Sequence, residues 1–228
     1  ADYHFAATAG ARRNLLDEGV AKEDILITGN TGVDALQQGM WLLEKGPDSS
    51  SVRELRRRLD SGKKVVLVTV HRRENQGERL REICGALAEL SGRPDLQILF
   101  PVHPNPRVRE TVKASLGQCS DVVLTDALPY PAFLWAMGRC DLILTDSGGI
   151  QEEAVSMKKP VLLLREQTER PEAIESNWVE LAGTGKEAVM RHVSAALAGR
   201  DRADGRNPFG DGKASERIVS FIKASGLV

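Results

Sequence analysis

The sequence has few cysteines and no long apolar run. Its three cysteines, Cys84, Cys119 and Cys140, form no CxxC spacing, and each lies in or beside an apolar segment. This pattern argues against a disulfide framework and against a zinc site, so we expect a reducing, cytoplasmic compartment. No apolar run approaches the length needed to cross a bilayer, and residues 1–10 lack the basic and apolar regions of a secretory signal. We therefore expect a soluble protein without a membrane partner.

An excess of charge of one sign is also missing. The chain has 31 lysines and arginines against 32 aspartates and glutamates, which gives a net charge of -1 at pH 7. This balance provides no overall field that would draw the protein to nucleic acid or to an anionic membrane, so we expect neither partner. An anionic ligand would have to be held by a local group of residues.

The length and composition indicate a globular protein. The 228 residues, 41% hydrophobic and 28% charged, suit one large domain or one domain with part of another. The chain begins without Met and enters an apolar segment almost at once, which is consistent with a fragment of a longer protein.

Short β-rich runs recur along the chain, and most of them are apolar throughout. They are Ile25 to Thr28, Val65 to Val70, Gln97 to Val102, Val122 to Thr125, Leu142 to Thr145 and Val161 to Leu164. Continuous apolarity is typical of strands that are covered on both faces. Amphipathic stretches such as Glu78 to Leu90 and Ile150 to Met157 lie between the runs. The alternation predicts an α/β fold, with a Rossmann-like parallel sheet and helices on both faces.

Two helix starts are predicted from capping signals. Ser51 with Glu54, and Thr184 with Glu187, place a hydroxyl three residues before a carboxylate. In such a capping box each side chain accepts a hydrogen bond from the other residue's backbone. We interpret both signals as structural.

The segment LILTDSGGIQEEA at 142–154 predicts a phosphate site. An apolar strand runs into Asp146, Ser147, Gly148 and Gly149, and a helix follows. The two glycines remove the Cβ atoms that would keep an anion from the backbone, and the free N–H groups of a helix start favour negative charge. The alternative, an ordinary tight turn with a serine cap, fits the residues about equally well.

Two carboxylates one turn into the same helix suggest a nucleotide. Glu152 or Glu153 could accept the hydroxyls of a ribose whose phosphate lies at the helix start. The alternative for such a pair is a solvated helix face.

A second polar cluster follows the apolar strand within VVLVTVHRREN at 65–75. His71 comes directly after the strand, and Arg72 and Arg73 follow it. Ligands of open α/β sheets bind at strand ends, and an imidazole with guanidiniums suits a departing diphosphate. A solvated basic turn, with a pairing to Glu74, is the alternative. We favour that alternative for Arg73 and a function for His71.

Two further strand ends carry polar residues. His103, in the segment HPNP after the strand at 97–102, is an equal candidate for a ligand contact or for a loop cap. Arg170, after the strand at 161–164, could clamp a phosphate or pair with Glu169. His192 lies among apolar residues of an amphipathic stretch and is interpreted as structural.

Phe133 follows a proline-rich bend at 128–131 in a chain that is only 4% aromatic. Its ring could pack on a base. The pattern alone favours the alternative, in which Phe133 and Trp135 begin a helix and fill core.

Together these motifs resemble the bacterial non-hydrolysing UDP-N-acetylglucosamine 2-epimerases. The resemblance is carried in order by HFAATAGARRNLLDEGV at 4–20, ITGNTGVDAL at 27–36, VTVHRREN at 68–75, PVHPNP at 101–106, LTDSGGIQEEA at 144–154, TERPEA at 168–173 and NPFGDGKASERIV at 207–219. It therefore runs along the whole chain.

The resemblance implies the C-terminal half of a GT-B-like two-domain enzyme. Residues 1–31 would be the end of the N-terminal Rossmann-like domain, and residues 32–207 the UDP-binding Rossmann-like domain. Residues 208–228 would form a linker and a helix that packs back toward the N-terminal domain. Helical spacing at 214–224 agrees with such a helix.

The resemblance also implies an activity. Family members interconvert UDP-GlcNAc and UDP-ManNAc by elimination and re-addition of UDP, in polysaccharide biosynthesis, with no nicotinamide cofactor and no metal. The full-length enzyme would be an isomerase and a homodimer. The carboxylates credited with acid and base work would lie outside this chain, so we expect the chain alone to be inactive.

Site residues follow from the matched motifs. Those that resemble substrate contacts are Ser147, Gly148, Gly149 and Arg170 at the diphosphate, Glu153 at the ribose, and Leu128, through its backbone, with Phe133 at the uracil. His71 resembles the catalytic histidine. Arg72 and His103 match positions that in some members bind a second, allosteric UDP-GlcNAc.

Three other functions remain open at this stage. A GT-B glycosyltransferase would use the same helix start and ribose carboxylate, and the fold cannot exclude it. A non-catalytic UDP-sugar sensor would need only the binding residues. A hydrolysing 2-epimerase would release free ManNAc and UDP.

Overall fold

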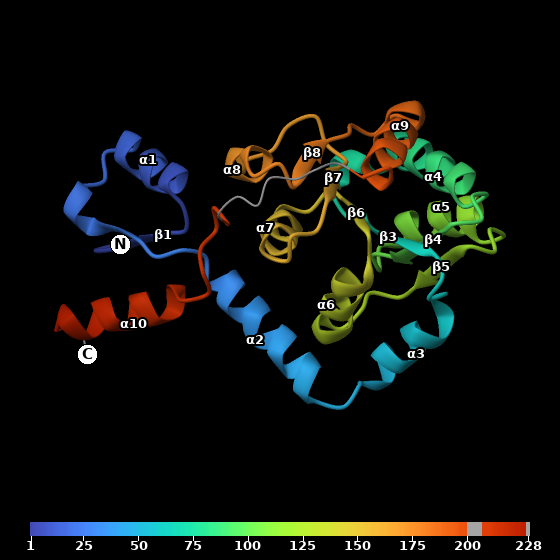
Figure 1. Cartoon of the computed structure of the whole chain (residues 1–228). Coiled ribbons are helices and arrows are strands. Elements are labelled where there is room, and N and C mark those ends of the chain that lie inside the picture. Colours follow the sequence, from blue (N-terminus) through green and yellow to red (C-terminus); the bar gives the residue numbers. More distant parts are fainter. Residues whose placement is uncertain (200–206, 227–228) are drawn as a thin grey trace. The chain divides into compact units, whose positions relative to one another are not determined.

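The computed structural model describes residues 1–199 and 207–226, which form two compact units (Figure 1). Unit 1 consists of residues 1–45 with the described C-terminal residues 207–226, and unit 2 consists of residues 46–199. The boundaries that the resemblance implies, after residues 31 and 207, refer to the complete protein and stay a prediction.

Unit 2 contains a six-stranded sheet in which every pairing is parallel. The strands are β3 (Lys64–Thr69), β4 (Leu96–Pro101), β5 (Val122–Thr125), β6 (Leu142–Thr145), β7 (Val161–Leu163) and β8 (Val179–Leu181). Their order is β5-β4-β3-β6-β7-β8. The predicted parallel α/β sheet is confirmed, and β8 is an edge strand that the apolar runs did not indicate.

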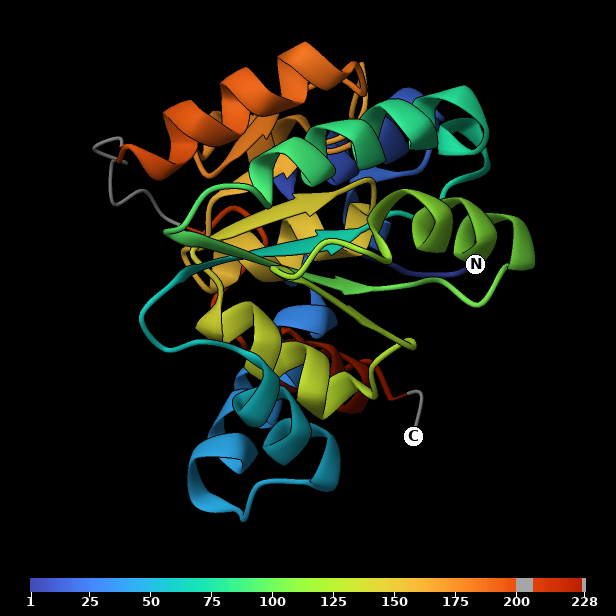
Figure 2. The same ribbon diagram turned by 90° about the vertical axis from the view of Figure 1, so that its right-hand side faces the viewer.

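Helices cover both faces of this sheet (Figure 2). They are α3 (Ser50–Arg58), α4 (Glu78–Leu90), α5 (Pro106–Leu116), α6 (Tyr130–Arg139), α7 (Gly148–Ser156), α8 (Pro171–Glu175) and α9 (Lys186–Leu197), with a short 3-10 helix at Arg73–Asn75. The α4, α5 and α9 helices lie on one face, and α3 and α6 lie on the other. Within the described ranges no helix is long and apolar enough to cross a membrane.

The burial of β3 shows why its sequence is apolar throughout. Val65, Val66, Leu67 and Val68 are all fully buried. Val66 and Val68 belong to the core beneath α4, α5 and α9, and alternation along a strand turns Val65 and Leu67 to the opposite face. Helices on both faces therefore demand an apolar residue at every position.

Both predicted capping boxes are wrong. The α3 helix begins earlier than expected, and Ser49 caps it by accepting a hydrogen bond from the Val52 N–H at 3.3 Å. The N-cap of α9 is Gly185, which has no side chain. In each case a nearby residue takes the cap position, because hydroxyl spacing alone does not decide where the chain turns into a helix.

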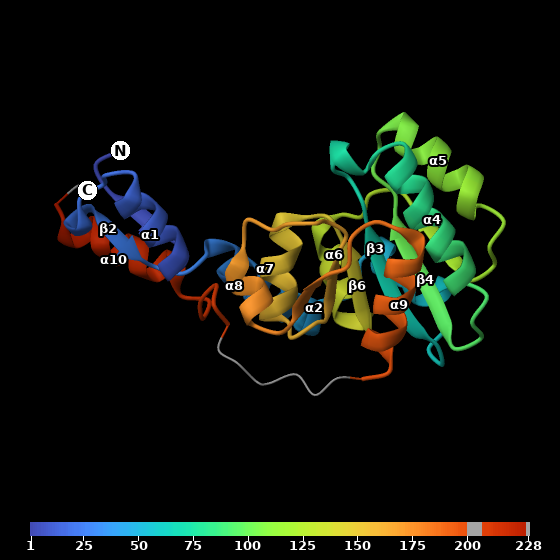
Figure 3. The same ribbon diagram turned by 90° about the horizontal axis from the view of Figure 1, so that it is seen from above.

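Unit 1 is a small parallel pair of strands with three helices. Its elements are β1 (His4–Ala6), α1 (Ala9–Asp17), a 3-10 helix (Lys22–Asp24), β2 (Ile25–Ile27), α2 (Thr31–Lys45) and α10 (Ala214–Ala224). Figure 3 shows α1 and α10 beside β2. The predicted terminal helix at 214–224 is therefore confirmed as an element.

Side chains and close backbone contacts join α10 to the N-terminal residues of unit 1. The Phe221 ring meets the Tyr3 and Phe5 rings edge-on, with centroids 4.9 and 5.6 Å apart. The Asp34 carboxylate accepts the first two N–H groups of α10. Gly210, at φ +115°, approaches Gly29 so closely that an added Cβ would lie 3.1 Å from the Gly29 Cα. Residues 180 or more positions apart in the chain thus form one packed body.

We expect Cys119 alone to react with a thiol reagent in the folded protein. Cys84 and Cys140 are buried, and burial raises the pKa of each thiol to about 12, whereas Cys119 is partly exposed. Thiolates are the reactive form, so the two buried thiols should be protected until the protein unfolds. Titration with a chromogenic disulfide, before and after denaturation, counts the thiols that react in the folded and in the unfolded protein. Rapid reaction of two thiols in the native protein would contradict it.

Candidate functional site

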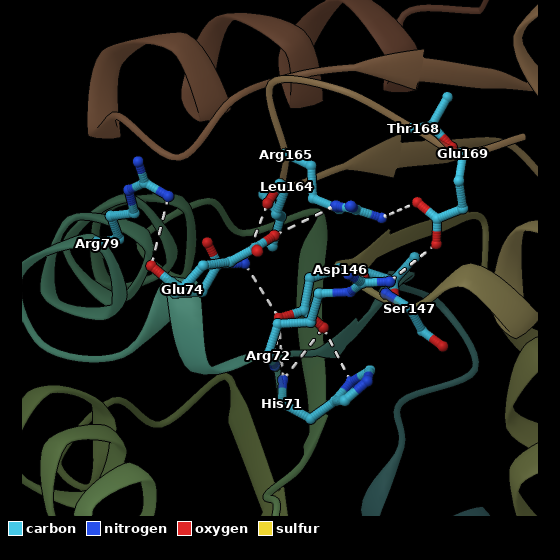
Figure 4. Close-up of polar contacts among 12 residues, drawn as sticks. His71, Arg72, Glu74, Arg79, Asp146, Ser147, Leu164, Arg165, Thr168 and Glu169 are labelled. Carbon is cyan, nitrogen blue, oxygen red and sulfur yellow. Dashed lines mark hydrogen bonds and ion pairs between the residues drawn. The ribbon is translucent and has the colours of Figure 1, made fainter. Parts of the chain in front are cut away.

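The carboxyl ends of β3, β6 and β7 bring several of the predicted site residues together (Figure 4). His71 and Arg72 follow β3, while Asp146 and Ser147 follow β6. Arg170 lies beyond β7, at the start of α8. Because the strands are parallel neighbours in the order β3-β6-β7, these segments meet at one edge of the sheet.

Asp146 is the buried centre of this edge. Its side chain is 0% exposed, and its carboxylate accepts the backbone N–H groups of His71, at 3.1 Å, and of Arg72, at 2.9 Å. The side-chain amide of Asn75 donates a further bond at 3.0 Å. Burial opposes ionisation, yet these bonds and that of the His71 ring hold the pKa of Asp146 below its ordinary value. A fixed, ionised carboxylate thus joins the ends of β3 and β6.

The His71 ring lies against this carboxylate. Its Nδ1 is 2.9 Å from the Asp146 Oδ1, and 43% of its side chain is exposed. The hydrogen bond to Asp146 raises the pKa of His71 above 6.5, partly offset by burial and by the charge of Arg72. The stabilisation from charged His71 is complete below pH 6.5 and is lost as the pH rises through the raised pKa. The stabilisation from Asp146 is complete above pH 3.8 and is lost as the pH falls through the lowered pKa.

His103 reaches the same edge from the end of β4. Its ring stacks near that of His71, with centroids 6.4 Å apart and the planes inclined by 28°. Its Nδ1 accepts the Asn105 N–H at 3.2 Å. The structure therefore supports the loop-capping interpretation of His103, and a ligand contact stays a prediction.

Three arginines converge on Glu169. Its carboxylate accepts bonds from Arg165 at 2.6 Å, Arg72 at 2.9 Å and Arg170 at 3.0 Å. Burial favours the neutral acid, but a backbone bond, the Arg165 bond and nearby positive charge lower the pKa of Glu169 to about 2. The alternative pairing of Arg170 with Glu169 is thus present in the structure. Arg170 also forms an ion pair with Glu152.

The start of α7 is open on its Gly149 side. Apart from its chain neighbours and the nearby backbone of α7, no described atom lies within 4 Å of the place that a Gly149 Cβ would take. A Cβ on Gly148 would lie 2.8 Å from the Arg170 Nη1, so Arg170 approaches the helix start closely. Ser147 is the N-cap residue of α7, as the tight-turn alternative predicts, but within the described residues its side chain forms no capping bond to the helix. The helix start thus has free N–H groups, an open side and a guanidinium beside it.

Glu152 and Glu153 have different surroundings, and neither lies on a solvated face. Glu152 pairs with Arg170 and is 18% exposed. Glu153 accepts the Tyr130 hydroxyl bond at 2.8 Å. Burial, together with the charge of Glu152, raises the pKa of Glu153, and burial and the carboxylate also raise the pKa of Tyr130. Glu153 is therefore a half-buried acceptor, as a ribose contact requires.

Leu128 and Phe133 are both half-buried and lie at the start of α6. Leu128 precedes α6, and Phe133 lies in its first turn. Tyr130, three residues before Phe133, bonds to Glu153 on α7. Residues three apart on a helix share a side, so Phe133 lies on the side of α6 that faces Glu153. The arrangement fits a base placed beyond a ribose.

The remaining sequence interpretations concern residues outside this edge. His192 forms a 2.7 Å contact with Glu180, which agrees with a structural role. Arg73 is exposed, as a solvated turn predicts, although Glu74 pairs with Arg165 and not with Arg73. The Trp135 ring carries the Arg56 guanidinium 5.1 Å from its centroid, so it is only partly core.

Sequence reasoning gave no role to three residues that contact this site: Asp146, Arg165 and Tyr130. Asp146 comes directly after an apolar strand, which is the signal that singled out His71, and it was interpreted only as part of the turn. Glu169 was considered only as a partner of Arg170, whereas its bond to Arg72 and the Tyr130 bond to Glu153 join distant segments and have no local signal.

Comparisons with known proteins agree on one family. The family profile described as UDP-N-acetylglucosamine 2-epimerase matches residues 1–223. The UDP-N-acetylglucosamine 2-epimerase of Escherichia coli strain K12 is 45% identical over 230 residues, which cover 97% of this chain and 60% of that protein.

Solved structures show the same likeness. The UDP-GlcNAc 2-epimerase of Neisseria meningitidis bound to UDP-GlcNAc is 34% identical, with a TM-score of 0.92, over 98% of this chain and 62% of the other. The Methanocaldococcus jannaschii UDP-GlcNAc 2-epimerase in complex with UDP-GlcNAc and UDP is 35% identical, with a TM-score of 0.84, over 98% of this chain and 61% of the other. The chain spans about 60% of the length of these relatives. It belongs to the UDP-N-acetylglucosamine 2-epimerase family.

Proposed function

We propose that the complete protein interconverts UDP-GlcNAc and UDP-ManNAc, and that this chain supplies its UDP-binding site and one catalytic histidine. The observation that carries the proposal is the meeting, at one sheet edge, of an open helix start, Arg170 and a carboxylate-held His71. These groups suit the binding and the departure of a diphosphate.

The diphosphate would bind at the start of α7. The N–H groups of Gly148 and Gly149 can donate to phosphate oxygens, and Gly149 leaves room for them. The Ser147 N–H instead donates to the Thr145 hydroxyl at 3.0 Å. Arg170 would supply a guanidinium that is already at the helix start. Its partner Glu169 is more than a third exposed and can yield to a ligand that carries more negative charge.

The nucleoside would extend along α7 toward α6. Glu153 can accept the two ribose hydroxyls, in exchange for the Tyr130 bond that it holds here. Phe133 and the backbone of Leu128 would then meet the uracil. Arg72 and His103 remain candidates for a second UDP-GlcNAc, with Arg72 bonded to the Asp146 carbonyl and to Glu169.

In this reaction His71 would act on the leaving group, UDP. A base outside this chain would take the C2 proton, the C1–C2 double bond would form, and the anomeric C–O electron pair would go to UDP. Protonated His71 can stabilise or protonate the oxygen on which that charge develops. The hydrogen bond to Asp146 raises the pKa of His71, which favours the imidazolium form. UDP would then add back with the opposite configuration at C2.

Product analysis of the complete protein tests the function. Incubation with UDP-GlcNAc alone should yield UDP-ManNAc, without an acceptor. Release of free ManNAc and UDP would indicate a hydrolysing epimerase. Sugar transfer that requires an acceptor would indicate a GT-B glycosyltransferase. Binding of UDP without any conversion would indicate a UDP-sugar sensor.

The 228-residue chain by itself should bind UDP weakly and not interconvert the two sugars. The reason is that the acid and base carboxylates implied by the resemblance lie outside it, and a C2 proton is too weakly acidic to leave without a placed base. Calorimetry with UDP and a coupled assay measure the two properties. Conversion by this chain would show that the base lies within it.

Substitution of Glu153 by Gln should weaken UDP binding more than the binding of inorganic diphosphate. Loss of a hydrogen bond to a charged acceptor corresponds to about a 10- to 100-fold loss of affinity for UDP. The neighbouring Glu152→Gln is the matched control, because Glu152 contacts Arg170 and should affect both ligands alike. Calorimetry measures the affinity of each variant for UDP and for inorganic diphosphate. Equal losses of affinity for both ligands in Glu153→Gln would contradict a ribose contact by Glu153.

A further inference from the structure

Of the two His71 ring nitrogens, Nδ1 contacts Asp146, and Nε2 forms no hydrogen bond with a residue that the structure describes. Nδ1 lies 2.9 Å from the Asp146 Oδ1, and Asp146 is fully buried while the ring is half-exposed. The carboxylate cannot follow a moving ring, because it also holds the backbone N–H groups of His71 and Arg72 and the Asn75 amide. Figure 4 shows the ring turned toward this carboxylate.

We infer that Asp146 is a positioning residue that fixes the tautomer and the orientation of the His71 ring. Nδ1 then keeps its proton, and Nε2 is the nitrogen that gains and loses a proton. The inference rests on the proposed function and deepens it, because the Nε2 would face the departing diphosphate.

The tautomer follows from the chemistry of the carboxylate. An ionised carboxylate can only accept hydrogen bonds, so Nδ1 must keep its proton whether the ring is neutral or charged. Asp146 is held ionised by its four donor groups. Titration of His71 therefore occurs at Nε2, the nitrogen that points away from the buried carboxylate.

Three titratable or charged groups lie close to the His71 ring: Asp146, Arg72 and His103. Asp146, at the end of β6, favours the imidazolium, and Arg72, the next residue along the chain, disfavours it. The His103 ring, at the end of β4, stacks 6.4 Å away and would add repulsion if it were charged. Asp146 is the acid in direct contact with the ring, so its removal should change both the charge and the direction of the ring.

Both Asp146 carboxylate oxygens accept the His71 N–H, at 3.1 Å each. Oδ1 also contacts the ring, and Oδ2 also accepts the Arg72 N–H and the Asn75 amide. Asn75 contacts the same carboxylate but not the ring. An Asn75 variant therefore perturbs the Asp146 surroundings without removing the ring contact, and it serves as a matched control.

The first test needs no substitution. Long-range proton–nitrogen NMR spectra of the 15N-histidine-labelled chain report the tautomer of each of its four histidines. Neutral His71 should carry its proton on Nδ1. A His71 signal with the proton on Nε2 would overturn the inference, whether or not any variant folds.

The second test uses Asp146→Asn with Asn75→Ser as the control. Asp146→Asn should lower the pKa of His71 and abolish the Nδ1–H preference, while Asn75→Ser should keep the Nδ1–H preference and change the pKa of His71 less. In the complete protein Asp146→Asn should lower kcat by roughly 10- to 100-fold with little change in KM, a part of the effect of one acid or base. The decline of kcat at high pH should move to lower pH. An unchanged profile, or the same shift in Asn75→Ser, would reduce Asp146 to a structural role.

The two proposals fail in different ways. If the complete wild-type protein interconverts the sugars but His71 shows the other tautomer, only the positioning role is wrong. If His71 is Nδ1-protonated but the complete protein does not interconvert UDP-GlcNAc and UDP-ManNAc, the proposed function is wrong.

Discussion

Gly149→Val should abolish UDP binding and leave unit 2 folded. The valine side chain would enter the open space at the start of α7, where, apart from its chain neighbours and the nearby backbone of α7, no described atom lies within 4 Å of the added Cβ. It should therefore meet no protein group, but it would fill the place of a phosphate and cover the free N–H groups. We expect the affinity for UDP to fall by more than about 100-fold, since several charge-assisted hydrogen bonds would be lost together.

Calorimetry with UDP, together with circular dichroism, measures this result. Gly185→Val is the matched control, because Gly185, the N-cap of α9, also lies at a helix start and has an open Cβ position. Its UDP affinity should match that of the unsubstituted protein. Gly148→Val is less informative, because its side chain would displace the Arg170 guanidinium. A folded Gly149→Val protein that binds UDP normally would place the diphosphate elsewhere.

His71→Asn in the complete protein should preserve much of the UDP affinity and lower turnover by roughly a hundredfold or more, the usual scale for one acid or base group. The side-chain amide of asparagine has a donor about where Nδ1 stands, so it can keep the Asp146 contact. It has no counterpart of Nε2. The substitution thus removes the proton and the positive charge that act only as the anomeric bond breaks.

Steady-state kinetics with UDP-GlcNAc and calorimetry with UDP separate the two effects. His192→Asn is the control, because His192 contacts Glu180 on β8 and not the residues at the carboxyl ends of β3, β6 and β7. This substitution should leave turnover unchanged. If His71→Asn kept normal turnover and lost only affinity, His71 would be a binding residue. Departure of UDP would then depend on Arg170 and the helix start.

Much of unit 2 could be predicted from local patterns. The runs at 122–125 and 142–145 form strands with the predicted bounds, and the stretch at 78–90 forms the predicted helix. These predictions succeed because a strand buried on both faces must be apolar throughout, while a helix on one face of a sheet needs an apolar stripe only. The edge strand β8 has three residues and a partly exposed face, so it lacks that signal.

The same reasoning placed the polar residues of the site. His71, His103 and Ser147 follow apolar strands closely in the chain, and parallel strands put their carboxyl ends at one edge. The sequence by itself thus determined which polar segments follow buried strands and to which end of the sheet they belong.

Only the tertiary structure decided which charged groups pair. His71 and Asp146 are 75 positions apart in the sequence, and Arg72 and Glu169 are 97 positions apart. They meet because β3 lies next to β6, and β6 next to β7, an order that no local pattern contains. Hydrogen bonds and ion pairs act over a few ångströms, so their partners are set by strand order and not by sequence spacing. For this reason the sequence indicated His71 as a catalytic candidate, and the fold revealed the carboxylate that holds it.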